Sequence, residues 1–265
     1  MHSFTYHRPA NVKAAQALLA KAKDARVLAG GQTLIPSLKL RLTSFDNIVD
    51  LGAIKGLDKI EVKGKNLLIG AMATHHAVAT SAAVKKAIPA LAHLAGMIGD
   101  PAVRNRGTIG GSISNNDPAA DYPGALLALD ATVITSKRKI PADKFFKGLF
   151  ETALGKGEIV LQVSFPIPKK AGYAKFPNPA SRFALVGVFV ADTGKEARAA
   201  VTGAGEQGAF RSKEIEAALK KGFKPDSVAG VKISAAGLNS DIHAAADYRA
   251  HLIGVMAKRA LEAAA

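Results

Sequence analysis

Two double-glycine segments constrain this chain more than any other feature of its sequence. The first runs Ala29, Gly30, Gly31, Gln32, Thr33, Leu34, Ile35, and the second runs Thr108, Ile109, Gly110, Gly111, Ser112. Glycine lacks a Cβ and can adopt positive φ, so successive amides can converge on an anion, and the following Thr33 or Ser112 hydroxyl adds a donor. Taken alone, each pair is more often an ordinary turn. Together they predict two turns that line one pyrophosphate, and hence a nucleotide cofactor.

The usual nucleotide-binding folds are disfavoured by the same segments. Neither segment has the G-x-G-x-x-G pattern of a Rossmann unit or the G-x-x-x-x-G-K-[ST] pattern of a P-loop. The sequence therefore predicts a nucleotide site built in another way.

The length and composition favour a globular protein with two domains. The chain has 265 residues, and its Pro-, Lys- and Gly-rich stretch 166–172 is the predicted domain boundary. No apolar run approaches the roughly 18 residues of a membrane-spanning helix, and the first residues lack a signal pattern, so we expect no integral membrane segment and a cytoplasmic location. Cysteine is absent, which excludes disulfides, thiolate zinc sites and iron–sulfur clusters held by this chain's own thiolates.

The chain is strongly basic, with 36 Lys and Arg against 21 Asp and Glu and a net charge of +15. Such a charge raises nucleic acid as a partner. However, the basic residues are scattered and aromatic residues make up only 6% of the chain, without an interleaved stacking series. We expect no nucleic-acid binding and interpret the charge as a surface for an acidic partner or an anionic cofactor.

Hydrophobic periodicity predicts alternating helices and strands around one long irregular segment. Helices are expected at 12–23, from about 34, at 77–98 with a break near Pro89, at 124–129, at 211–221 and at 241–264. Strands are expected at 26–28, 47–51, 131–135, 159–165, 184–191 and 197–202, and a β-hairpin is expected across 57–71. Residues 99–123 are polar and rich in Gly and Pro without periodicity, which predicts an ordered functional loop.

Five segments, in order, carry a resemblance to a known family. They are FTYHRPANVKAAQALLA; RVLAGGQTLIPSLKLRL with NIVDLG; RNRGTIGGSISNNDPAADYPGALLALDA; NPASRFALVGVFVA; and VTGAGE. Over nearly its whole length the chain resembles the flavin-binding medium subunit of molybdenum hydroxylases, of the carbon monoxide dehydrogenase medium-chain type, a relative of the flavin domain of xanthine dehydrogenase.

The resemblance implies an α+β fold in two domains. Residues 1–168 would form a vanillyl-alcohol-oxidase (PCMH)-type FAD-binding domain with subdomains at about 1–55 and 56–168, and residues 169–265 a small α+β domain with a three-stranded antiparallel sheet and helices. FAD would bind non-covalently, with its diphosphate between the two glycine turns. Further cofactor neighbours implied by the family are Asp121, Val160, Lys175 and Phe183.

The chain departs from the family at some positions. Gln32 follows the first glycine pair where some relatives have His, and Phe183 lacks a phenolic hydroxyl, so it could stack on the flavin ring but not hydrogen-bond to it. The absence of cysteine excludes the subgroup that acts on aromatic CoA esters, whose medium subunit carries an inserted cluster.

The family also implies a function without catalytic or metal-binding residues in this chain. FAD would receive electrons that originate at a molybdenum centre and pass them to an external acceptor, with molybdopterin and 2Fe–2S clusters only in partner subunits. The partners would be an iron–sulfur small subunit and a molybdopterin large subunit, in a dimer of heterotrimers. A self-contained FAD-dependent oxidase of the same fold and a non-enzymatic basic binding module remain alternatives.

Several charged residues have simpler alternative roles. Arg104 and Arg106 suit either phosphate or an ordinary ion pair, and Asp121 suits either the cofactor or a cap of the helix at 124–129. His75 and His76 lack a third ligand at metal-like spacing, which argues against a metal site.

Overall fold

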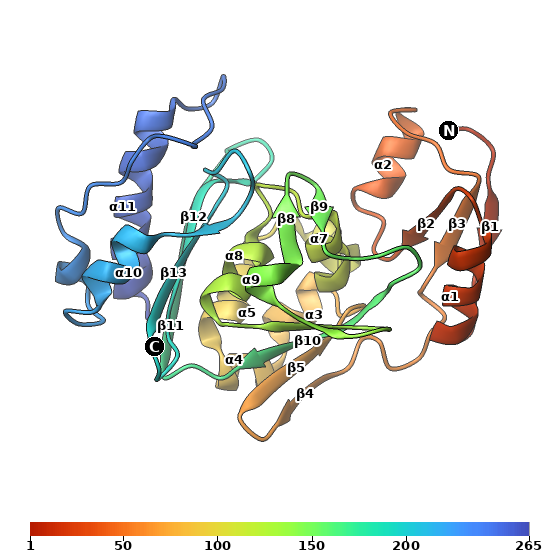
Figure 1. Cartoon of the computed structure of the whole chain (residues 1–265), viewed down its shortest axis with the longest axis horizontal. Helices are drawn as coiled ribbons and strands as arrows, with labels where there is room; N and C mark the ends of the chain where they lie inside the picture. Colours follow the sequence, from red (N-terminus) through yellow and green to blue (C-terminus); the bar gives the residue numbers. More distant parts are fainter. Residues whose placement is uncertain (265) are drawn as a thin grey trace.

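The computed structural model describes residues 1–264 and contains three main β-sheets that follow one another along the chain. Figure 1 shows them side by side, with the N-terminal sheet at one end of the molecule, a central sheet with its helices, and the C-terminal sheet at the other end. The fold is α+β, as the sequence predicted.

The N-terminal sheet is parallel and small. Its strands are β1 (Thr5–His7), β2 (Ala25–Leu28) and β3 (Asn47–Asp50), in the order β1-β3-β2, with α1 (Val12–Lys21) and α2 (Leu34–Lys39) between them. Helix α1 begins at Val12 because the Asn11 side chain accepts a hydrogen bond from the Ala14 amide at 2.9 Å. The first glycine turn connects β2 to α2.

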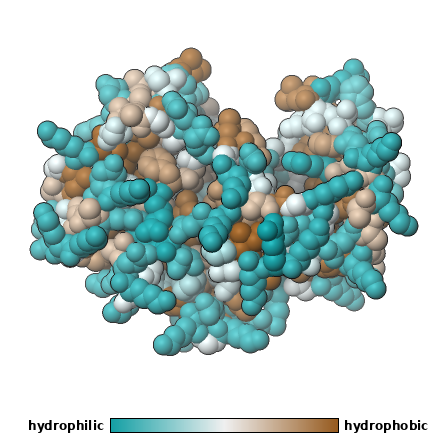
Figure 2. Space-filling view, viewed as in Figure 1, coloured by the Kyte–Doolittle hydropathy of each residue, from teal (hydrophilic) through white to brown (hydrophobic). Residues whose placement is uncertain are grey.

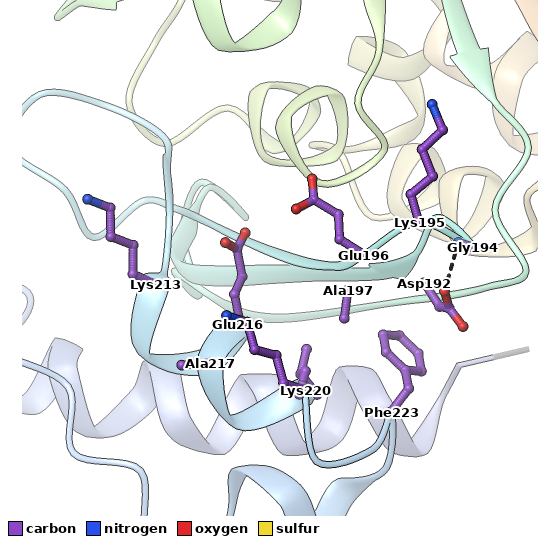
Figure 3. A pocket seen from close by; sticks show the side chains of 11 residues that line it. Asp192, Gly194, Lys195, Glu196, Ala197, Lys213, Glu216, Ala217, Lys220 and Phe223 are labelled. Carbon is purple, nitrogen blue, oxygen red and sulfur yellow. Dashed lines mark hydrogen bonds between the residues drawn. The ribbon is translucent and has the colours of Figure 1, made fainter.

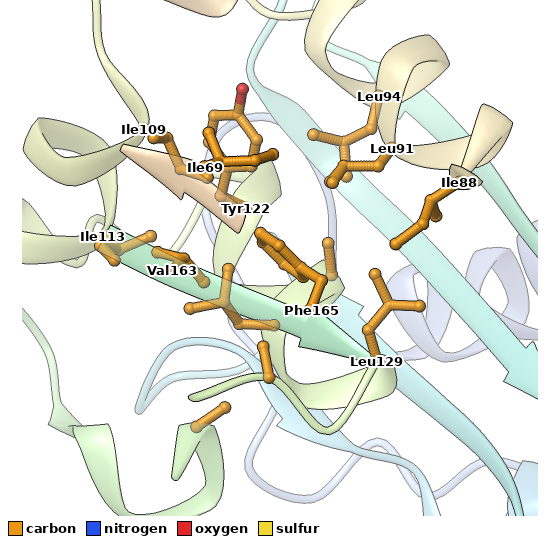
Figure 4. Close-up of a cluster of buried hydrophobic side chains, with 14 of the residues drawn as sticks. Ile69, Ile88, Leu91, Leu94, Ile109, Ile113, Tyr122, Leu129, Val163 and Phe165 are labelled. Atoms are coloured by element: carbon orange, nitrogen blue, oxygen red, sulfur yellow. The ribbon is translucent and has the colours of Figure 1, made fainter. Parts of the chain in front are cut away.

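The central sheet is antiparallel and carries the main core. Its order is β4 (Ile60–Lys63), β5 (Asn66–Gly70), β10 (Val160–Pro166), β6 (Thr132–Thr135) and β7 (Lys139–Pro141). Short helix α9 (Ala142–Phe145) and the hairpin of β8 (Phe146–Gly148) and β9 (Glu151–Thr152) follow β7. Figure 4 shows Ile69 and Phe165 of the sheet close to Tyr122 and Leu91 of the helices, in one buried apolar cluster.

A helix with one break near Pro89 was predicted over 77–98, and the structure has a second break, at Ser81, that was not predicted. Three helices occupy the region: α3 (His75–Thr80), α4 (Ala82–Ala87) and α5 (Pro89–Gly96). Ser81 ends α3 and caps α4, because its hydroxyl accepts from the Val84 amide at 3.4 Å. The predicted break near Pro89 is confirmed, with Pro89 as the first residue of α5.

The segment predicted as a loop, 99–123, is also different: it contains α6 (Pro101–Arg106), α7 (Ile109–Asn115) and the start of α8 (Asp121–Ala128). The side chains of Asp100 and Thr108 cap α6 and α7. The second glycine pair therefore lies in the first turn of α7. Glycine's low helix propensity hid this helix, which tertiary contacts stabilise: the Gly110 amide donates to the Ala71 carbonyl at 2.9 Å.

The C-terminal sheet is antiparallel and has four strands, not the three expected: β11 (Lys170–Pro177), β12 (Ala184–Asp192), β13 (Ala197–Thr202) and the two-residue β14 (Phe210–Arg211). Strands β12 and β13 were predicted, whereas β11 was not and begins inside the predicted boundary stretch 166–172. Helices α10 (Lys213–Leu219) and α11 (Ala246–Glu262) and the 3-10 helix η1 (Pro225–Val228) follow. Alternate residues of β12 serve two cores: Val188 packs with α11, whereas Phe189 joins the central core. The sheet is thereby fixed to the central body.

Among the residues that the model describes, no helix is both long enough and apolar enough to cross a membrane.

Candidate cofactor site

The structure brings the two glycine turns together. A Cβ placed on Gly30 would lie 2.1 Å from the carbonyl oxygen of Arg106 and 2.8 Å from Cα of Gly107, immediately before the second turn. A Cβ on Gly111 would lie 3.7 Å from that of Ala29. The first turn thus packs directly on the backbone that leads into α7, which only glycine allows at position 30.

The first turn offers unoccupied hydrogen-bond donors. Within the described part of the chain, the amides of Gly30, Gly31, Gln32 and Thr33 have no acceptor. Gly31 has φ of +73°, and Thr33 begins α2 without using its side chain as a cap. Gln32 and Thr33 are exposed, and the Gln32 amide group makes only a long contact, 3.4 Å, to the Gly30 carbonyl. Successive free amides around a left-handed glycine form a concave site suited to an anion.

The second turn is built differently, because the amides of Ile109 to Ser112 are already bonded. The Ile109 amide donates to Ala73 at 3.1 Å, and the Gly111 amide to the Thr108 hydroxyl at 3.1 Å. The Ser112 amide donates to the Thr108 carbonyl at 3.0 Å. This turn therefore contributes small size and the half-buried Ser112 hydroxyl, whereas the first turn contributes the free amides.

The predicted residues Asp121 and Lys175 meet each other in a buried cluster. Lys175 Nζ lies 2.9 Å from Asp121 Oδ1 and donates to the Met97 carbonyl at 2.9 Å, and the two side chains are 1% and 4% exposed. The Tyr173 hydroxyl donates to the same carboxylate oxygen. Burial raises the pKa of Asp121, while Lys175 and Tyr173 act in the opposite direction. The cluster joins α8 and the end of α5 to β11, and it is Ala120, not Asp121, that occupies the N-cap of α8.

The other two predicted neighbours lie in contrasting places. Val160 begins β10 and is buried in the central apolar core. Phe183, between β11 and β12, is 49% exposed, and its ring is free to meet a ligand.

Sequence reasoning missed two residues that support this region. Tyr173 was not singled out, although it stands two residues from Lys175 on one strand and therefore faces the same side. His75 lies below the second turn: its amide donates to the Gly107 carbonyl at 2.9 Å, and a Cβ on Gly107 would lie 2.6 Å from its Nε2. No local sequence pattern around His75 indicates that its side chain packs against the second turn.

His75 is an uncharged part of the core. Burial, with a smaller contribution from Arg104, lowers the pKa of His75 to about 4. Its ring packs on Tyr122 with centroids 5.4 Å apart. The described residues include no group of three or more His, Cys, Asp or Glu side chains that could hold a metal ion.

The side chain of Arg104 takes a structural role here, whereas the phosphate role of Arg106 stays a prediction. Arg104 Nη1 donates to the carbonyls of Ile98 and Gly99 at 3.1 and 2.8 Å, so it holds the chain after α5. Arg106 provides the carbonyl that Gly30 packs against, and its side chain is exposed.

A depression of about 610 Å³ lies elsewhere, between the β12–β13 hairpin and α10. Figure 3 shows its mixed lining, with Lys213, Glu216, Lys220 and Phe223 among the side chains. Glu216 is already paired with Arg211, at 2.7 Å. The paired glycine turns do not line this depression, so it is separate from the candidate cofactor site.

Comparison with known proteins identifies the family. Residues 2–168 match the family model described as the FAD binding domain in molybdopterin dehydrogenase. The chain belongs to this family. It is 33% identical to the carbon monoxide dehydrogenase medium chain of Hydrogenophaga pseudoflava, over 98% of this chain and 96% of the relative. It is 41% identical to the glyceraldehyde dehydrogenase medium chain of Sulfolobus acidocaldarius, over 71% and 69% of the two chains.

A solved structure agrees over the whole chain. Carbon monoxide dehydrogenase from Hydrogenophaga pseudoflava, in a form that lacks the Mo-pyranopterin moiety of its cofactor, matches with a TM-score of 0.90 and 35% identity, covering 99% of this chain and 97% of that one. The predicted family, its α+β fold with a PCMH-type FAD-binding domain, and FAD as the cofactor are confirmed. The chain is a flavoprotein subunit of the oxidoreductase class.

Proposed function

We propose that this chain is the electron-transfer subunit of a molybdenum hydroxylase complex. It would accept electrons from the iron–sulfur clusters of a small subunit, after oxidation of a substrate in a molybdopterin large subunit, and deliver them to an external acceptor. The observation that carries this proposal is the first glycine turn, whose free amides stand directly against the second turn. The cytoplasmic location, the division at residues 168 and 169, and a dimer of heterotrimers belong to the same proposal.

The residues at the paired turns suit the diphosphate of FAD. The amides of Gly30 to Thr33 and the hydroxyls of Thr33 and Ser112 would donate to its oxygens, while Ala29 and Gly111 keep the side chains there small. Gly110 and Ile109 would support the turn from the protein side, because Gly110 packs closely on Ala71 and Ile109 is buried in the core; Leu34 and Ile35 lie at the start of α2. When bound, FAD supplies the redox chemistry that side chains cannot.

Phe183 is suited to cover one face of the flavin ring by stacking, since it is exposed. For Asp121, Lys175 and Val160 the structure favours support from beneath the site, because all three are buried. The Asp121–Lys175 ion pair would hold β11, and with it the connection that bears Phe183, in place beside the FAD-binding domain.

The substrate of the complex would be chosen outside this chain. The relatives' names include carbon monoxide dehydrogenase and glyceraldehyde dehydrogenase, two very different substrates for similar medium chains. Such a division of labour fits a subunit that positions a cofactor and contributes no catalytic side chain.

Anaerobic mixing tests the proposal. The complex purified from its native source should contain an iron–sulfur and a molybdenum subunit, and its flavin absorbance should bleach when the substrate is added. The isolated, flavin-loaded chain should not bleach under the same conditions. Substrate-driven bleaching of the isolated chain would instead identify a self-contained oxidase, and a complex whose flavin stays oxidised while its clusters are reduced would refute the electron route.

A further inference from the structure

Seven lysines form one basic edge of the molecule. They come from four segments that are separate in sequence: the β4–β5 turn, α4, the connection from β10 to β11, and the turn between β12 and β13. All seven are exposed, and together they define the basic edge: Lys63, Lys65, Lys85, Lys86, Lys169, Lys170 and Lys195. None of them belongs to the candidate cofactor site.

Direct contacts join the four segments. The Ile167 amide donates to the Lys65 carbonyl at 2.9 Å, and the Lys169 amide donates to the Asp192 carbonyl at 2.8 Å. A Cβ on Gly194 would lie 3.1 Å from Cε of Lys169, so the stem of this lysine lies against the turn that bears Lys195. Helix α4 packs against β4 and β5. The lysines therefore belong to one continuous surface.

The basic edge lies away from the paired glycine turns. In Figure 1 the β4–β5 turn, α4 and the turn between β12 and β13 lie along the lower edge of the view, whereas α2 and α7 lie away from that edge. Figure 2 shows hydrophilic side chains along much of the same edge. A surface that covers the basic edge would leave the candidate cofactor site uncovered.

The chain does not neutralise the positive charge of the basic edge. In the described part of the chain, the lysines that form ion pairs lie elsewhere: Lys59, Lys175 and Lys258. Of the carboxylates in the four segments, Glu61 is paired with Lys59, and Glu196 lies 2.6 Å from Arg198. Asp192 accepts only the neutral Gly194 amide, at 2.8 Å. Seven unpaired cations thus face solvent beside one carboxylate without a cationic partner.

The residue types on the basic edge favour a layer of anionic groups over a specific protein partner. Protein interfaces are enriched in Arg and aromatic side chains and depleted in Lys. Here every cation is a lysine, and Val62, 48% exposed, is the one large apolar side chain that stands out in these four described segments. Lysine is strongly hydrated, and clusters of about four to eight basic residues are typical of proteins that bind anionic lipid headgroups.

We propose that the basic edge is a peripheral docking surface for an anionic lipid membrane. The lysine ammonium groups would lie among the headgroup phosphates, and no apolar segment would insert. Binding would therefore be electrostatic and reversible, and it would weaken as salt screens the charges. The paired glycine turns would face away from the bilayer. This proposal does not depend on the electron route proposed above.

The test compares two double variants that change the net charge equally. Lys63→Glu with Lys65→Glu reverses two charges of the basic edge, on either side of Gly64, where even an added Cβ would meet nothing within 4 Å, so folding should be retained. Lys13→Glu with Lys23→Glu is the matched control, because both residues are exposed and lie on or just after α1. Figure 1 places α1 in the N-terminal lobe, away from the basic edge. Melting temperatures verify folding.

Co-sedimentation is measured with vesicles of equal parts phosphatidylcholine and phosphatidylglycerol, and with phosphatidylcholine alone. The FAD-loaded chain and the complex purified from its native source are both used, at low and high salt. We expect both to bind the anionic vesicles only, and binding to fall with salt. The basic-edge variant should lower the partition coefficient by about tenfold or more, whereas the control variant should stay close to wild type.

Several results would overturn the proposal. Equal loss in the two double variants would mean that net charge, and not the basic edge, drives binding. Binding by the isolated chain but not by the complex would mean that a partner subunit covers the edge. Absence of vesicle binding, together with duplex DNA binding that the basic-edge variant abolishes, would identify a nucleic acid as the occupant. Substrate-driven bleaching of the flavin in the complex should be unchanged in the basic-edge variant, so the electron route is tested separately.

Discussion

The carbonyl oxygen of Arg106 stands 2.1 Å from the place where a Cβ of Gly30 would be. No real Cβ tolerates such a contact with backbone, so Gly30 is required for the first turn to reach the segment before α7. The contact fixes where the free amides of the first turn lie relative to the second turn. The candidate cofactor site depends on this junction between the N-terminal sheet and the central helices.

The first prediction concerns stability at the junction. Gly30→Ala should lower the free energy of unfolding by about 1–3 kcal/mol, the usual scale for overpacking a tight contact. The matched control is Gly254→Ala in α11, where a Cβ would meet nothing within 4 Å. Since alanine is the better helix former, this control should gain roughly 0.5–1 kcal/mol. Urea unfolding of both variants measures the difference; a Gly30→Ala variant as stable as wild type would contradict the packing.

The second prediction concerns the buried Asp121–Lys175 pair. Asp121→Ala should destabilise the chain by about 3 kcal/mol or more, because it leaves the Lys175 cation buried without its partner. The double change Asp121→Asn with Lys175→Met should recover most of this loss, since it removes both charges and keeps an acceptor for Tyr173.

Exposed Lys258 and Glu262 provide the control pair, 4.0 Å apart, for which removing either partner should cost under roughly 1 kcal/mol. A double-mutant cycle on chemical denaturation measures both pairs. If the coupling free energy were equally small in the two pairs, the buried ion pair would not hold β11 to the central body.

The third prediction is a pH dependence from His75. Burial is the main reason that the pKa of His75 is lowered from 6.5 to about 4 in the folded chain. The imidazole of His75 therefore binds a proton more readily in the unfolded chain than in the folded chain. His75 therefore stabilises the fold fully above pH 6.5, and this contribution is lost as the pH falls through the folded value of about 4. The loss should amount to roughly 3 kcal/mol.

Unfolding free energies measured from pH 7 to pH 4 in wild type and His75→Leu check this contribution. The leucine variant should show a shallower slope over that range. Parallel slopes in the two proteins would mean that His75 keeps an ordinary pKa.

The fourth prediction concerns the net charge of +15. The chain should bind duplex DNA only weakly, and its affinity should fall steeply with added salt. Binding releases counterions from the DNA, and this release becomes less favourable as the salt concentration rises. A filter-binding titration at several salt concentrations measures this. Sequence-selective binding that survives physiological salt would reverse the interpretation of the charge.

Much of the fold could be predicted because periodicity is local. The strand predicted at 184–191 coincides closely with β12, and the predicted 57–71 hairpin with β4 and β5. The helix α7 was missed because Gly110 and Gly111 are typical of a turn, whereas the helical form is stabilised by the Thr108 cap and by contacts with Ala71 and Ala73, which are distant in sequence.

The cluster at Asp121 could be predicted only in part. Resemblance to a family marked Asp121 and Lys175 as site residues, yet their mutual pairing and the Tyr173 contact join segments far apart in the sequence. No local pattern encodes such a pairing, and the strand period would have added Tyr173 only once Lys175 was placed on a strand.

Equilibrium dialysis of FAD against the isolated chain tests the central claim most directly. Gly31→Val places a β-branched residue at φ of +73°, and Gly111→Val crowds Thr108, whose hydroxyl would lie 3.0 Å from the new Cβ. Both should weaken FAD binding more than tenfold, which is about 1.4 kcal/mol. Gly56→Val is the matched control, because it imposes similar strain at φ of +82° where nothing lies within 4 Å, and it should keep wild-type affinity. Wild-type FAD affinity in both turn variants would contradict the account.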